Sequence, residues 1–163
     1  MRFSLFCVFL ALLACISTAS RDDDELVYCS YAIEGMAGLG TDYCELIADS
    51  GSVPRVVVVK NKNCRFAEQV TDTFEVDDTV IASLRNMLNK KDLDAVAGYR
   101  EEAGLEGGRE YRFHIEYKSG RTIHASWHTH SPLPEAVDIF STIRSFFAPW
   151  MDKKEKANAG VPD

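Results

Sequence analysis

The sequence predicts an α+β domain in which one antiparallel sheet of about six strands carries two helices on one of its faces. Three observations support this fold class. Short alternating or β-branched apolar segments follow one another, two segments have helical periodicity, and the links between the strands are short. Since short links join antiparallel neighbours, the expected order β-β-β-β-α-β-β-α gives a two-layer fold whose other sheet face is open to water.

Four strands are expected before the first helix, at Leu26–Ile33, Thr41–Ala48, Arg55–Lys60 and Val70–Val76. The third reads Arg-Val-Val-Val-Val-Lys, a β-branched run typical of a buried strand. Asp77 or Asp78 then caps a helix from Thr79 to about Asn89, because an aspartate accepts hydrogen bonds from the first N–H groups of a helix. The apolar stripe predicted to pack this helix on the core is Val80, Ile81, Leu84, Met87 and Leu88.

Residues 90–108 are rich in glycine and charge and are expected to form a long connection, with one helical turn at Asp92–Ala97. The following segment, Arg109–Trp127, alternates polar and apolar residues around Lys118-Ser119-Gly120-Arg121, which is a turn signal. It predicts a β-hairpin.

Two registers are open to this hairpin. A two-residue Ser119-Gly120 loop would mix apolar and imidazole side chains on one face. A type I turn with Gly120 in the left-handed conformation, a G1 bulge, shifts the pairing by one residue and separates them. We therefore predict the bulged turn, with His114 opposite His124 on the open face. The face turned toward the helices is then Tyr111, Phe113, Ile115, Tyr117, Ile123, Ala125 and Trp127.

A second helix is expected from Pro134 to about Phe147, with Pro149 ending it. Its apolar stripe, which would pack against the aromatic face of the hairpin, is Ala136, Val137, Phe140, Ile143, Phe146 and Phe147. The domain would therefore span residues 26–150, followed by a frayed tail over residues 151–163.

The segment Met1–Ala19 has one charge, Arg2, before an apolar run that is too short to span a bilayer, and it predicts a secretory signal. Leu12-Leu13-Ala14-Cys15 is similar to the lipobox of bacterial lipoproteins, in which the cysteine is lipidated. Signal-peptidase cleavage near Ser17-Thr18-Ala19 is the alternative. The protein is thus expected to be exported, as a periplasmic or outer-membrane lipoprotein anchored at Cys15 or in a secreted form, with residues 20–25 as an acidic spacer.

Charge limits the partners. The chain has 18 basic against 25 acidic residues, a formal net charge of −7. This balance argues against nucleic acid and against electrostatic attachment to an anionic membrane, so the membrane would be reached only through a lipid on Cys15.

Cys29, Cys44 and Cys64 follow the signal segment. If the first two strands form a hairpin centred on Met36-Ala37, Cys29 lies opposite Cys44, and a disulfide between them would contribute about 3 kcal/mol. Three unbridged cysteines are the alternative.

Several features together resemble small exported domains of Gram-negative bacteria, mostly lipoproteins, that have no assigned activity. The matching features are Tyr31–Gly40, Gly107-Gly108, the segment Ile115–Gly120, and an amphipathic helix after Pro132. The resemblance covers most of the chain after the signal. It implies an envelope-associated domain and no catalytic residue.

The histidines are the candidate metal ligands. His114 and His124 face each other in the bulged register, and His128 and His130 follow, with Asp138 in the next helix. Imidazoles with carboxylates can bind zinc, copper or nickel. The run from His128 to Asp138 is similar to the His-x-His-Pro…Ser-x-x-Asp signature of JAMM-type zinc metallopeptidases, although proline is displaced by one residue and Glu135 stands at the serine position.

Two functional hypotheses follow. The first is a non-enzymatic envelope or secreted module that binds a protein or a glycan through the open sheet face or the loop over residues 90–108, without a cofactor. The second is a zinc-dependent hydrolase or metal-binding protein that uses the histidines. No nucleophile elbow, phosphate loop or dinucleotide fingerprint is present, so no catalytic residue is predicted.

Overall fold

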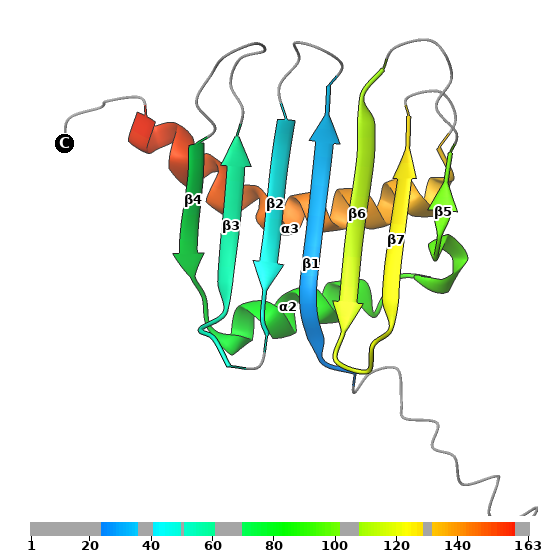
Figure 1. Cartoon of the computed structure of the whole chain (residues 1–163), viewed down its shortest axis with the longest axis horizontal. Coiled ribbons are helices and arrows are strands. Elements are labelled where there is room, and N and C mark those ends of the chain that lie inside the picture. The colour runs from blue at the N-terminus through cyan, green and yellow to red at the C-terminus, as the bar shows by residue number, and fades with distance from the viewer. Residues whose placement is uncertain are drawn as a thin grey trace, which may run out of the picture.

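The computed structural model describes residues 24–35, 41–49, 51–60, 70–101, 108–128 and 132–158, which form an α+β fold (Figure 1). Within these residues a seven-stranded sheet carries two α-helices. The elements are β1 (Leu26–Glu34), β2 (Thr41–Ile47), β3 (Arg55–Lys60), β4 (Val70–Glu75), α2 (Asp78–Leu88), β5 (Tyr99–Arg100), β6 (Glu110–Tyr117), β7 (Thr122–Trp127) and α3 (Pro134–Asn158).

The strand order is β4-β3-β2-β1-β6-β7-β5, and every neighbouring pair is antiparallel except β5 with β7. The expectation of about six purely antiparallel strands is therefore wrong in its detail, because β5 adds a parallel edge strand within the stretch predicted to be loop. β5 has only two residues, which is too short for the alternation of polar and apolar residues that reveals a strand in a sequence. Backbone bonds from Gly98 N–H to the His124 carbonyl and from Glu101 N–H to the Ser126 carbonyl, each 3.0 Å, hold this edge strand.

Both helices lie on the same side of the sheet, as predicted (Figure 1). α3 crosses behind the strands from β5 to β4, and α2 lies across one end of the same side. Asp77 caps α2, with its carboxylate accepting bonds from the N–H groups of Thr79 and Val80. The core between sheet and helices includes Leu84 and Leu88 of α2 together with the apolar sides of the strands and of α3.

The bulged hairpin is confirmed. Gly120 has φ 87°, and the Tyr117 N–H bonds the Arg121 carbonyl at 2.9 Å while the Gly120 N–H bonds the Tyr117 carbonyl at 2.9 Å. His114 consequently pairs with His124. The side chains buried under the helices are Phe113, Ile115, Tyr117, Ile123, Ala125 and Trp127, while Tyr111 is partly buried on the same side.

The predicted end of α3 is wrong, because the helix continues through Pro149 to Asn158. A proline inside a helix costs about 3 kcal/mol, partly because its missing N–H leaves a carbonyl unbonded. Packing beyond the proline offsets that cost. The Trp150 ring lies 5.3 Å from that of Phe146, and the Met151 sulfur lies 3.2 Å from the Cys44 sulfur.

The predicted apolar stripe of α3 also needs one correction. Val137 is 40% exposed, and Ile139 is buried instead. The two residues are two positions apart, so they lie on different sides of the helix.

The predicted register of the first hairpin is wrong as well. Cys29 pairs with Leu46 and Cys44 pairs with Tyr31, and both cysteines are free, buried thiols. The observed register differs from the expected one by two residues. A shift of two residues keeps the same side chains on the inner face. The apolar pattern therefore cannot distinguish the two registers. Residues on such a diagonal lie about 7–8 Å apart, which is too far for a disulfide without movement of the backbone.

The last residues of the predicted acidic spacer lie against the domain. Asp24 accepts a bond from the Ser119 hydroxyl at 2.6 Å, and Glu25 pairs with the Lys118 ammonium at 2.6 Å. These contacts fix the start of β1 on the turn between β6 and β7.

Several predictions fall outside the described residues, namely the signal segment over residues 1–19 with Cys15, then Cys64, His130 and residues 159–163. Among the helices that the structure describes, none combines the length and the apolar character needed to cross a membrane.

Candidate functional site

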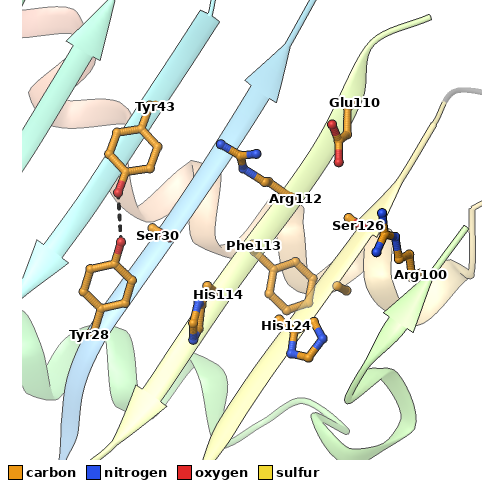
Figure 2. Close-up of a pocket in the computed structure, with 11 residues that line it drawn as sticks. Tyr28, Ser30, Tyr43, Arg100, Glu110, Arg112, Phe113, His114, His124 and Ser126 are labelled. Carbon is orange, nitrogen blue, oxygen red and sulfur yellow. Dashed lines mark hydrogen bonds between the residues drawn. The ribbon is translucent and has the colours of Figure 1, made fainter. Parts of the chain in front are cut away.

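The helix-free face of the sheet is hollowed over β2, β1, β6 and β7, and the hollow reaches the edge strand β5. The hollow measures about 470 Å³, within the range of small-molecule sites, and five strands contribute to it. Figure 2 shows the side chains that surround it. Its polar and aromatic lining is Tyr28, Ser30, Tyr43, Arg100, Glu110, Arg112, His114, His124 and Ser126.

Strand pairing explains why the hollow forms where it does. Arg112, Ser126 and Arg100 occupy one row across β6, β7 and β5, with a serine between two arginines. In the next row His124 and His114 lie beside Ser30 of β1. Small side chains therefore form the floor, and longer side chains on either side rise around them.

The two arginines differ in their partners. Arg112 extends over β1 and forms an ion pair with Glu34 (Figure 2). Arg100 lies beside Ser126 and has no ion pair within the described part of the chain (Figure 2). Neighbouring strands lie about 4.8 Å apart, so the two backbone positions are separated by about 10 Å. Of these two arginines, Arg100 is therefore the one without an acidic partner among the described residues.

The two histidines lie side by side, with their ring centroids 6.4 Å apart. The Nε2 atom of His114 is 3.1 Å from a carboxylate oxygen of Glu116, a distance suited to an ion pair when the imidazole is protonated. The two groups are not aligned for a hydrogen bond, which leaves this nitrogen without a hydrogen-bond partner among the described residues. The His114 and Tyr28 rings pack edge to face, with their centroids 5.7 Å apart.

Two tyrosines form the wall on the β2 side of the hollow. The hydroxyl groups of Tyr28 and Tyr43 are 2.8 Å apart, and each donates to the same oxygen of Glu45, at 2.9 Å and 2.5 Å. Burial is the main cause that raises the pKa of both phenols, and the Glu45 carboxylate raises both further. The phenols therefore stay protonated in neutral solution and hold this wall in a fixed arrangement.

The charge of the hollow differs from that of the whole protein. Arg100 and Arg112 line it together with one carboxylate, that of Glu110, whereas the chain as a whole has a net charge of −7. Glu34 compensates Arg112, but it does not line the hollow. Because Glu34 pairs with Arg112 and Glu45 bonds both tyrosines, acidic groups also border the hollow, and Arg100 is the lining residue whose charge has no acidic partner among the described residues.

The structure separates the residues predicted to bind a metal. His114 and His124 meet on the open face, whereas His128 lies just after β7 and lines a different hollow on the helix side. Both carboxylate oxygens of Asp138 are bonded by Lys91, at 2.7 and 2.9 Å. Within the described residues no three histidine, cysteine, aspartate or glutamate side chains gather as a metal site. The zinc site stays a prediction without geometric support, with His130 outside the described part.

The alternation along the hairpin places both His114 and Arg112 on the open face, but it gave no reason to treat Arg112 as a site residue, and Arg100 and the two tyrosines were not assigned to this face. Arg100 could not be assigned to a strand face from the sequence, because its strand has only two residues and shows no alternation of polar and apolar side chains. Tyr28 and Tyr43 face the hollow only because β1 lies beside β6, a pairing between distant segments.

No protein-family model matches the chain, and no curated protein is significantly similar to it. The resemblance to exported bacterial domains therefore stays a prediction.

Proposed function

We propose that the protein is a binding module whose site is the hollow on the open sheet face, and that it holds a small hydroxyl-rich anion such as an acidic sugar. One observation carries the proposal. Arg100, a guanidinium without an acidic partner in the described chain, borders a hollow of about 470 Å³ lined mainly by hydrogen-bonding side chains.

The chemistry of the lining supports this ligand class. A guanidinium binds a carboxylate through two parallel hydrogen bonds, which fixes both the position and the orientation of the anion. Ser30, Ser126 and Glu110 offer donors and acceptors for ligand hydroxyls around that anchor. The rings of Tyr28 and Tyr43 add a wall that is already held in place.

Binding is proposed rather than catalysis because the hollow shows no activated nucleophile. In the described residues neither Ser30 nor Ser126 is hydrogen bonded to His114 or His124, the arrangement that would activate a hydroxyl. The export predicted from residues 1–19 would place the module outside the cytoplasm, where acidic saccharides of the cell envelope are suitable ligands.

Isothermal titration calorimetry with glucuronate tests the proposal, with glucose as the uncharged control ligand. We expect glucuronate to bind and glucose to bind at least tenfold more weakly. The Arg100→Ala variant should lose about tenfold in affinity, because a hydrogen-bonded charge pair contributes roughly 1.5 kcal/mol or more.

Arg55→Ala is the matched control variant. Arg55 belongs to β3, on the same open face, but does not line the hollow. Equal affinity of the two variants for glucuronate, or equal affinity of the wild-type protein for glucose and glucuronate, would contradict the proposed site.

A further inference from the structure

A second hollow, of about 390 Å³, lies on the opposite side of the same hairpin, between the ends of β6 and β7 and the first turns of α3. Its residues alternate in sequence with those of the open-face hollow. Tyr111 precedes Arg112, and Trp127 follows Ser126. The two hollows are therefore separate sites on the two faces of one pair of strands.

The floor of this second hollow is aromatic. The rings of Tyr111 and Trp127 are stacked, with centroids 5.8 Å apart and planes 12° apart. Phe140 of α3 presents its ring at a steep angle to both, at 5.6 and 5.3 Å. Trp127 and Phe140 are only 3% and 6% exposed, so the core holds both rings rigidly, and the partly buried Tyr111 offers most of the aromatic surface that a ligand could reach.

The rim of the hollow is formed by one side of α3. Val137 lies three residues before Phe140 and four before Ser141, and Arg144 lies four residues after Phe140; these spacings place residues on the same helix face. Val137 is an exposed aliphatic residue at the hollow, which the packing of the core does not require. Ser141 supplies a hydroxyl beside it.

Arg144 gives the rim its charge. Its side chain is exposed and makes no ion pair within the described part of the chain. Two acidic groups near this end of the molecule are already engaged. Asp138 is bonded by Lys91, and Glu101 accepts the backbone N–H of His128 at 3.1 Å. A cation above an aromatic floor is complementary to a ligand with a flat apolar body and one negative charge.

We propose that this second hollow binds an aromatic monocarboxylate, with the ring on the floor of Tyr111, Trp127 and Phe140 and the carboxylate at Arg144 and Ser141. The volume suits a ligand of this size. The site is distinct from the open-face hollow and requires a different ligand chemistry.

The test is an NMR titration of the protein with 3-phenylpropanoate, with its neutral amide and with propanoate. We expect saturable shifts of the Trp127 indole N–H with the first ligand, at concentrations on the order of 1 mM. The amide and propanoate should each bind at least about fivefold more weakly, because one lacks the charge and the other the ring. No saturable shift with 3-phenylpropanoate would overturn the proposal.

Two variants locate the ligand. Ser141→Trp should fill the hollow and abolish binding, whereas Ser145→Trp, at an exposed position of the same helix outside the hollow, should bind as the wild type does. Arg144→Ala should weaken binding about three- to tenfold, and Arg100→Ala should leave it unchanged. Unaltered binding by Ser141→Trp would exclude this location, and unaltered binding by Arg144→Ala would exclude the proposed carboxylate contact. Loss of glucuronate binding at the open face would leave these results unaffected.

Discussion

At the scale of single residues, the two thiols of the described chain show how burial sets reactivity. Cys29 and Cys44 are fully buried side chains of β1 and β2. Burial raises the pKa of the Cys44 thiol to about 11 and raises that of Cys29 further. Because the thiolate is the reactive form, both groups should be inert in the folded protein near neutral pH.

Alkylation with iodoacetamide at pH 8, followed by peptide mass spectrometry, checks this prediction. Cys29 and Cys44 should stay unlabelled in the native protein and be labelled fully in denaturant without any reductant. A Cys29–Cys44 disulfide would leave both unlabelled in denaturant as well. Rapid labelling of the native protein would show instead that the thiols are accessible, against the structure.

The same pKa shift gives stability a pH dependence. Between the ordinary thiol pKa, near 8.5, and the raised value of about 11 for Cys44, the unfolded chain releases a proton that the folded chain retains. The stability that the protein gains by keeping the Cys44 thiol protonated is therefore fully present below pH 8, and it is lost as the pH rises toward 11.

At the scale of elements, the hairpin of β6 and β7 sets the position of both hollows. Its bulge depends on Gly120, whose φ of 87° lies in the left-handed region. A one-residue slip in this hairpin would turn one strand over relative to the other, so that imidazole and aromatic side chains would be mixed on each face. The turn is thus the local feature on which the separation of the two faces depends.

Gly120→Ala should lower the free energy of unfolding by about 1–2 kcal/mol, measured by urea denaturation, because an alanine is strained at this φ. No heavy atom lies within 4 Å of the position that a Cβ would take, so the loss reflects backbone conformation alone. Gly120→Asn should cost less, since asparagine tolerates the left-handed region better. Equal losses for alanine and asparagine would argue against this explanation.

α3 illustrates where local rules give way to tertiary packing. Proline normally marks the end of a helix, and the sequence alone offered no reason to extend α3 past Pro149. Trp150 and Met151 supply that reason only through contacts with Phe146 and with Cys44 of β2. The contact between Met151 and Cys44 joins residues 107 positions apart, so local periodicity could not reveal it.

At the scale of the whole molecule, the sequence determined which side of each element is buried better than it determined which elements are neighbours. Period-two alternation was enough to assign His114 and His124 to the open face and Phe113 to the core. It could not predict that β1 pairs with β6, since strand pairing between distant segments leaves no local pattern. The β1 and β2 side of the candidate site depends on that pairing, because it brings Tyr28 and Ser30 beside His114.

The hollow on the open face is the proposed ligand site, and NMR can map where the ligand binds. During a glucuronate titration we predict that the shift changes concentrate at Arg100, Arg112, His124 and Ser126, with none on α2. Shift changes confined to the helix side of the sheet, or no changes at millimolar glucuronate, would show that glucuronate does not bind in this hollow.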